Sequence, residues 1–280
     1  MTKHTLSPYA ICIAPVFALA LVLIPLFPVS AHEYWIEPLD FTPAAQQDVQ
    51  AHLKVGSDFK GQMLSYIPQF SVGYQLTTAQ GSIDLEGMAG DRPALIFRPE
   101  EQGLNILTYQ TTKNRVTFAK MEKFTSYLAT QGMSEIAERH RERGLPESDF
   151  AESYSRYAKS LILVGDEVSG QDQATGMTIE LVALQNPYSL SDGDELSVQL
   201  LYLGQPLADN QVSIFIQDQG RIGELQISRV RTDAEGQINL NLQAGQVYLL
   251  NSIKMVEIND QEKVVWESFW ASLTFEITAN

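Results

Sequence analysis

Much of the chain alternates between apolar and polar residues, which is the pattern of β-strands with one buried face. In DVQAHLKVG (48–56) the apolar side chains occupy every second position, and His52 belongs to the polar set between them. Further short runs of this kind, bounded by Gly, Pro and Asp, predict strands at 70–78, 93–99, 104–112 and 156–165. The first half of the chain is therefore expected to be rich in β-structure.

Residues 119–143 break the alternation. The segments KMEKFTSYLATQG and MSEIAERHRERG are typical of short helices, and each ends at a glycine. They predict a small helical insertion within the β-rich part. His140 lies in the second predicted helix between two arginines, where we expect a solvated surface side chain.

From residue 177 onward, alternating segments are separated by turns such as SDGD, LGQPLADN and DAEGQ. About seven short strands in roughly a hundred residues favour an antiparallel sandwich of the immunoglobulin or prealbumin type. The polar stretch DEVSGQDQATG (166–176) is the expected linker. The predicted fold is thus mainly β with two β-sandwich-like units. The first is an N-terminal β-rich domain over 32–165 that holds the helical insertion near 119–143, and the second is a C-terminal sandwich over 177–280.

The first 31 residues carry the features of a cleaved signal peptide. A short polar start with Lys3 precedes the apolar run ICIAPVFALALVLIPLF (11–27), and PVSA then places Val29 and Ala31 at the small-residue positions that a signal peptidase reads. Two prolines interrupt the apolar run, which argues against a membrane anchor. We therefore expect export to the periplasm and a mature chain, 1–31 removed, that begins at His32.

The composition of the chain excludes several classes of function. The chain has 34 Asp and Glu against 19 Lys and Arg, a formal net charge of −15, and such a surface repels nucleic acid. The one cysteine, Cys12, lies in the expected signal peptide, so a metal site of the mature chain must use nitrogen and oxygen ligands, with Met as a further option. The motifs GxGxxG, P-loop, GxSxG and HExxH do not occur in the sequence. These observations favour a binding protein over an enzyme.

A mature N-terminal histidine has two nitrogen donors on one residue, the α-amine and imidazole Nδ1, which together can close a chelate ring on one metal ion. Their ordinary pKa values, about 8 and about 6.5, let both lose their protons near neutrality. Such donors suit Cu(II) or Ni(II) better than Mg²⁺ or Ca²⁺. A second imidazole would complete a brace, and His52 is a better candidate for it than His140. We therefore predict a transition-metal site at His32 and His52.

Aromatic residues give a second candidate surface. Trp266 and Trp270 share one face of the last predicted strand. An exposed pair could stack on a sugar ring, but core packing is the favoured interpretation.

Five segments occur in order along the chain: AHEYWIEP at 31–38, LKVGSDFKG at 53–61, YSRYAKSLILVG at 154–165, GQPLADNQVSI at 204–214 and SFWASLTFE at 268–276. On these segments the chain resembles the bacterial periplasmic proteins of the domain-of-unknown-function 4198 family, often described as nickel- or cobalt-uptake components. The resemblance implies a β-rich accessory of transition-metal uptake that works beside a transporter or an outer-membrane receptor. It also implies a role for His32, which matches the family's histidine after the signal peptide.

Two functions of different classes follow from these observations. One is a periplasmic protein that binds or hands over a divalent transition metal ion (Ni or Co, with Cu as an alternative) through His32. The other is a metal-independent β-sandwich module that binds carbohydrate or a protein partner. An oxidative copper enzyme of the polysaccharide monooxygenase type shares the N-terminal histidine, but it also needs a second brace histidine and a flat substrate face, and is disfavoured.

Overall fold

The computed structural model describes residues 32–218, 220, 223–259 and 263–279. The predicted signal peptide and its cleavage position lie outside the described residues. Neither helix in the described part of the chain is long and apolar enough to cross a membrane.

One large central sheet runs through the molecule. Its strands in spatial order are β14 (Gln226–Arg231), β13 (Gln211–Asp218), β16 (Gln246–Glu257), β17 (Val264–Ile277), β9 (Phe150–Val164), β7 (Gly103–Thr111), β4 (Ser71–Thr78) and β5 (Gly81–Asp84), and β8 (Asn114–Phe118) also pairs with β9. All neighbours are antiparallel except β17 and β9, which run parallel. The sheet therefore combines strands from the 32–165 and 177–280 segments.

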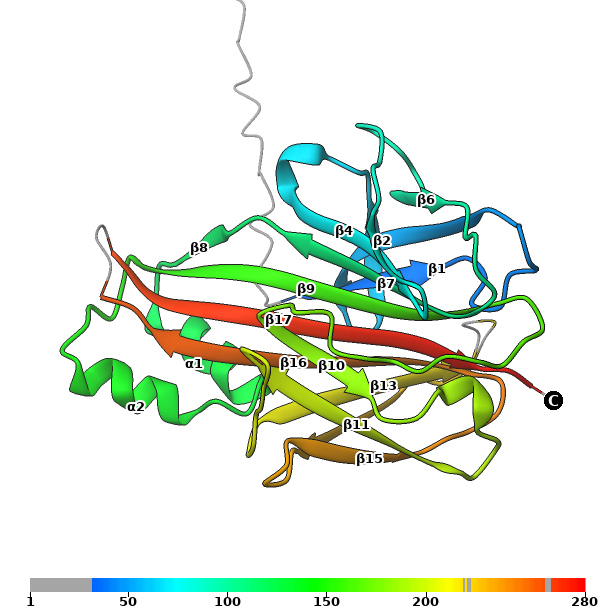
Figure 1. Cartoon of the computed structure of the whole chain (residues 1–280). Helices are drawn as coiled ribbons and strands as arrows, with labels where there is room; N and C mark the ends of the chain where they lie inside the picture. Colours follow the sequence, from blue (N-terminus) through cyan, green and yellow to red (C-terminus); the bar gives the residue numbers. More distant parts are fainter. Residues whose placement is uncertain (1–31, 219, 221–222, 260–262, 280) are drawn as a thin grey trace, which may run out of the picture.

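Two smaller sheets lie on opposite sides of the long central strands (Figure 1). The first contains β1 (Glu33–Pro38), β2 (Val49–Ser57), β3 (Lys60–Leu64) and β6 (Leu95–Phe97). The second contains β10 (Ile179–Ala183), β11 (Glu195–Tyr202), β12 (Gln205–Pro206) and β15 (Gln237–Asn241). Single 3-10 turns at Pro68–Phe70 and Pro187–Ser189 complete the regular structure of the described residues.

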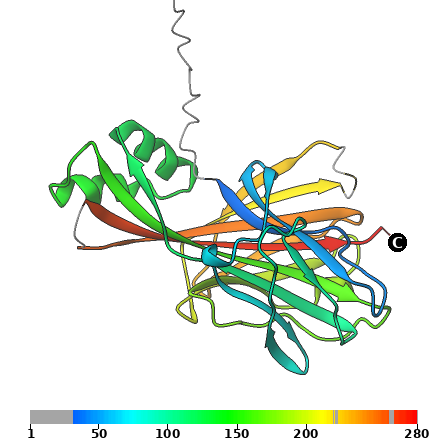
Figure 2. The ribbon, with the colours of Figure 1, turned by 90° about the horizontal axis from the view of Figure 1, so that it is seen from above.

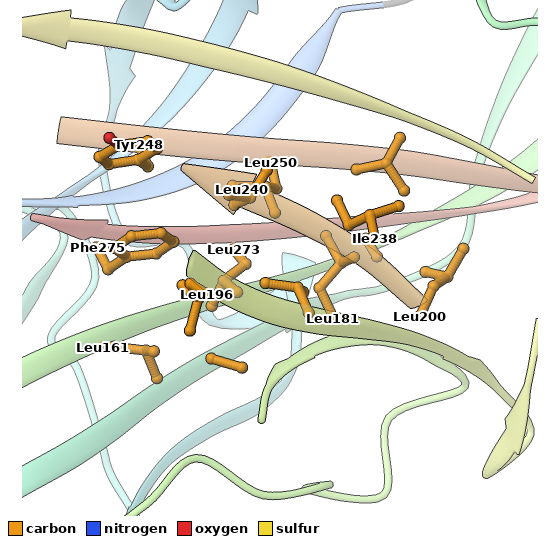
Figure 3. Close-up of a cluster of buried hydrophobic side chains, with 14 of the residues drawn as sticks. Leu161, Leu181, Leu196, Leu200, Ile238, Leu240, Tyr248, Leu250, Leu273 and Phe275 are labelled. Atoms are coloured by element: carbon orange, nitrogen blue, oxygen red, sulfur yellow. The ribbon is translucent and has the colours of Figure 1, made fainter. Parts of the chain in front are cut away.

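The face of the central sheet toward β10, β11 and β15 forms the largest core. Period-two alternation points every second residue of the central strands at this sheet, and the facing strands do the same. Figure 3 shows the resulting interdigitation of Leu161, Leu181, Leu196, Leu200, Ile238, Leu240, Tyr248, Leu250, Leu273 and Phe275. Full burial of each such side chain contributes about 1.5–3 kcal/mol, so this layer is a main source of stability.

Two groups of elements pack on the opposite face of the central sheet. At one end, α1 (Met121–Thr130) and α2 (Glu135–Glu142) pack on it through a core that includes Phe124, Phe150 and Trp266. Farther along, β1, β2 and β6 cover it through a separate core that includes Ile36 and Ile162. Figure 2 shows the helices at the end of the long strands opposite to the C-terminus.

The structure confirms the predicted fold class, mainly β with sandwich-like layers and a small helical insertion. Both helices fall inside 119–143. The strand predicted at 156–165 is longer, because β9 begins at Phe150 and its first residues pair with β8 and β17. The periodicity did not predict β1, β3, β5 or β8. Of these, β3 and β5 are short and largely exposed and so have no buried face, and β8 has only five residues.

The stretch 166–176 contains no strand, as expected of a connection, yet it is held firmly against the sheet. Lys159 on β9 is fully buried, and its Nζ lies 3.2 Å from carboxylate oxygens of both Asp172 and Glu180. Glu180 in turn accepts hydrogen bonds from the backbone N–H groups of Thr175 and Gly176. The division of the chain into domains at this stretch stays a prediction.

Candidate metal site at the start of the first strand

The first strand is fixed to the molecule on both of its faces. Glu33, Tyr34, Trp35 and Ile36 are all buried in succession. Trp35 packs in a small aromatic core, and the Ile36 carbonyl accepts a hydrogen bond from Thr274 Oγ1 at 2.8 Å. This anchoring gives His32, the residue just before β1, a defined position.

A tight hairpin between β2 and β3 lies next to the start of β1. Asp58 and Phe59 form its two-residue turn with φ values of 54° and 57°, the left-handed conformation that type I′ hairpin turns require. The buried Phe59 ring meets Trp35 edge-on at 5.6 Å. A β-carbon on Gly61 would lie 2.7 Å from the Trp35 ring, so only glycine permits this approach. The LKVGSDFKG segment therefore encodes a hairpin pressed against Trp35.

His32 lines a hollow of about 680 Å³ at this hairpin, together with Val55, Gly56, Ser57, Lys60, Gly61 and Gln62. The His32 side chain is partly exposed. Burial and then the positive charge of Arg156 lower the pKa of the imidazole below its ordinary value. The ring is therefore neutral at pH 7, which is the form that binds a metal ion.

Glu33, the first residue of β1, carries a buried carboxyl group whose charged neighbours are Asp58 and Arg229, whereas that of His32 is Arg156. Only 7% of the residue is exposed, and its Oε2 atom is buried without a hydrogen-bond partner among the described residues. Burial raises the pKa of Glu33 to about 7. The Asp58 carboxylate adds to the rise, whereas backbone N–H groups of Glu33 and Asp58 and the charge of Arg229 oppose it. An orphaned carboxylate oxygen of this kind is the natural partner of a cation or a bound donor.

The structure does not bring His32 and His52 together. The register pairs Glu33 with Gly56 and Glu37 with His52. Gly56, the residue opposite Glu33, lies four residues along β2 from His52, which is a distance of about 14 Å. Burial and then the Lys54 charge lower the pKa of His52, and its Nδ1 is buried without a partner among the described residues. A brace on one metal ion does not form in this arrangement, and a metal role for His52 stays a prediction.

His140 is not the solvated surface residue that its neighbours in sequence suggested. It lies on the buried face of α2 and is fully buried; its Nδ1 accepts a hydrogen bond from Trp266 Nε1 at 3.0 Å, and Nε2 donates to the Pro146 carbonyl at 2.9 Å. Desolvation is the largest cause of its lowered pKa. Long-range contacts with Trp266 and Phe150 explain the error, because helix periodicity alone cannot show them.

Trp266 and Trp270 are core residues, as the favoured interpretation had it. Trp266 is fully buried and Trp270 is 5% exposed, and both pack with the helices. Neither offers a surface on which a sugar could stack.

Sequence reasoning missed the buried carboxyl group of Glu33 and its charged neighbours Asp58 and Arg229. Arg229 lies on β14, far away in the sequence. Among the described residues, no three His, Cys, Asp or Glu side chains are grouped so as to hold a metal ion. Among the described residues, the candidate site is therefore limited to His32.

The sequence profile of one family, described as domain of unknown function (DUF4198), matches residues 29–254. The chain belongs to this family, which agrees with the resemblance seen in its motifs. No curated protein matches the chain.

Several solved structures are distantly similar. The D0-D1 domain of intimin is 11% identical, with 86% of this chain and 97% of that one covered and a TM-score of 0.20. A tetra-tandem repeat of a large adhesion protein is 10% identical, with 88% and 49% covered and a TM-score of 0.19. Trypsin-activated alpha-2-macroglobulin from Escherichia coli is 11% identical, with 89% and 16% covered and a TM-score of 0.22. Such low scores support no conclusion about this chain.

Proposed function

We propose that this chain is a periplasmic protein that binds a divalent transition metal ion, Ni(II), Co(II) or Cu(II), at a mature N-terminus formed by His32. The observation that carries the proposal is the position of His32 at the start of β1. Its ring lines an open hollow, and burial and the charge of Arg156 lower its pKa, which favours the neutral form that binds a metal ion.

The donor set fits such an ion. After removal of residues 1–31, the His32 α-amine and Nδ1 supply two nitrogen donors. Nitrogen-rich sets of this type favour Cu(II) and Ni(II) over Mg²⁺ and Ca²⁺. The firm anchoring of Tyr34, Trp35 and Ile36 limits the conformational entropy that binding must remove.

We propose binding and transfer of the ion, not catalysis. The partner would be a metal-uptake transporter or an outer-membrane receptor, as the family resemblance implies. The hollow beside His32 leaves the site accessible from one side, which suits transfer to a second protein.

Titration calorimetry of protein recovered from the periplasm tests the proposal. N-terminal sequencing should first show His32 as residue one. Removing a chelating donor should weaken Ni(II) or Cu(II) binding at least about tenfold, or 1.4 kcal/mol. We expect this loss for His32→Ala and for a variant with one Ala added ahead of His32, which keeps the ring but displaces the amine.

His52→Ala is the matched control and should bind with wild-type affinity, because His52 lies about 14 Å along the sheet. Equal affinity of wild type, His32→Ala and the extended variant would refute the N-terminal chelate and favour a metal-independent binding module.

A further inference from the structure

The buried ion cluster of Lys159, Asp172 and Glu180 joins three successive parts of the fold. Lys159 lies on β9, Asp172 in the connection 166–176, and Glu180 on β10. The side chains of Lys159 and Asp172 are 0% exposed, and that of Glu180 is 1% exposed. One ammonium and two carboxylates are thus enclosed in the protein interior, where charged groups are costly even when they are paired.

The Lys159 amine is held within reach of both carboxyl groups. Its Nζ lies 3.2 Å from Asp172 Oδ1 and 3.2 Å from Glu180 Oε2, and it donates to the Gln173 carbonyl oxygen at 3.0 Å. The carboxyl carbon of Asp172 is one C–O bond beyond Oδ1. An amine fixed beside a carboxyl group in this way has the proximity that makes an intramolecular reaction fast.

The two carboxyl groups are held differently. Glu180 accepts hydrogen bonds from the N–H and the hydroxyl of Thr175, both at 2.9 Å, and from the Gly176 N–H at 3.0 Å. These three donors stabilise its ionised form, which is the form that accepts a proton. Asp172 Oδ2 accepts a hydrogen bond from the Ala183 N–H at 2.8 Å, so negative charge that develops on this oxygen has a donor in place. The arrangement makes Glu180 the base and Asp172 the group that an amine can attack.

We propose that Lys159 and Asp172 join in an intramolecular isopeptide bond once the chain has folded. One proton passes from the Lys159 ammonium to Asp172 Oδ1, and the neutral amine attacks the carboxyl carbon. The Nζ–Cγ bond forms and the Cγ–Oδ1 bond breaks. Glu180 Oε2 takes a second proton from Nζ and delivers it to Oδ1, which leaves as water. The reaction consumes no oxidant or reductant.

The bond removes two of the three buried charges, because an ammonium and a carboxylate become a neutral amide. The remaining charge, on Glu180, keeps its hydrogen bonds from Thr175 and Gly176. Residues 32–280 contain no cysteine, so no disulfide can link β9 to the connection that follows it. An isopeptide bond supplies such a covalent link without cysteine. This inference does not rest on metal binding.

The intact mass of the denatured protein recovered from the periplasm tests the proposal. The wild-type chain should be lighter by one water molecule than the mass calculated from its sequenced N-terminus to Asn280. Trypsin then locates the loss, because the sequence has no Lys or Arg between Lys159 and Arg221. The linked chain should give residues 157–221 as one peptide that lacks a water, in place of the separate peptides 157–159 and 160–221.

Lys159→Arg, Asp172→Ala and Glu180→Gln should each have the full calculated mass. Arginine keeps the positive charge but does not lose its proton and so cannot attack, and glutamine keeps the size of Glu180 but cannot act as the base. The matched control is the pair of Lys54 and Glu37, whose Nζ and Oε1 are 2.7 Å apart but whose side chains are 18% and 16% exposed. Trypsin should cleave after Lys54 in every sample. Circular dichroism establishes that each variant is folded.

A wild-type chain of full mass overturns the proposal, whether or not the variants fold. A loss of water that persists in Lys159→Arg or in Asp172→Ala also overturns it, because the loss would then lie elsewhere in the chain. A loss that persists in Glu180→Gln refutes the assignment of Glu180 as the base. The mass is independent of nickel and copper, so failure of the metal site shows itself separately, as metal binding unchanged by His32→Ala.

Discussion

Two carboxyl groups, Glu33 and Glu152, are placed where their charged forms are disfavoured. Burial raises both pKa values to about 7, far above the ordinary 4.5. The folded protein therefore holds these protons more tightly than the unfolded chain does. The stability that they contribute is fully present below pH 4.5 and is lost as the pH rises through 7.

Glu152→Gln should remove part of this pH dependence. The amide keeps the size of the side chain and cannot ionise, so the variant escapes the cost of charging a buried group at pH 8. We expect the difference in unfolding free energy between variant and wild type to shift in favour of the variant by about 2–3 kcal/mol from pH 5 to pH 8. Urea unfolding at the two pH values measures this gain. Parallel pH profiles for variant and wild type would show that Glu152 titrates normally.

At the scale of elements, the buried ammonium group of Lys159 holds the segment 166–176 against the sheet. Lys159→Met removes the charge that faces Asp172 and Glu180 and leaves two buried carboxylates unpaired. We expect a loss of about 3–5 kcal/mol. Burial already raises the pKa of Asp172 despite the opposing charge of Lys159, so the loss should be larger at pH 8 than at pH 5.

Arg98→Met is the control for Lys159→Met, because its ion pair with Asp48 is exposed to solvent and its loss should leave the unfolding free energy almost unchanged. Chemical denaturation of the two variants gives the comparison. Equal losses would mean that Lys159 contributes no more than a surface charge.

The β2–β3 hairpin depends on close contact with Trp35. Gly61→Ala would place a β-carbon 2.7 Å from the Trp35 ring and 2.7 Å from the Val55 carbonyl oxygen, so the hairpin must shift. We expect a loss of about 1–3 kcal/mol and a changed tryptophan emission. In Gly73→Ala on β4, the added β-carbon would have only one neighbouring atom, at 3.9 Å. This variant should leave the unfolding free energy and the tryptophan emission unchanged. An unaltered thermal midpoint in Gly61→Ala would contradict the predicted clash.

Local patterns predicted the elements better than they predicted the site. Alternation located β2, β4 and β7 because each has one continuous apolar face, and glycines marked the helix ends. The environments of His140 and Glu152 could not be predicted, since both depend on β17, more than a hundred residues away. His32 was proposed from the sequence alone, whereas the orphaned oxygen of Glu33 became visible only in three dimensions.

At the scale of the whole molecule, the central sheet links the beginning and the end of the described chain. β17 pairs with β9 from Val264 to Thr274, with a register shift between Val264 and Trp266, and β9 belongs to the first segment of the sequence. The largest core contains side chains from both segments, including Leu104 and Leu161 with Leu196 and Leu250. Each segment alone would expose the apolar surface that the other covers and an unpaired strand edge at β9 or β17.

We therefore expect neither 32–165 nor 166–280 to fold when produced alone. The whole mature chain should unfold in one cooperative transition, because the shared sheet couples its layers. Urea titrations followed by far-UV circular dichroism and by tryptophan fluorescence should give coincident curves for the mature chain. Each fragment should show little amide chemical-shift dispersion, and mixing the two should restore it if the β9–β17 pairing can form between separate chains. A fragment with its own sharp transition would instead locate an independent folding unit on one side of 166–176, and the parallel pairing of β9 with β17 would then be a docking contact between two preformed sheets.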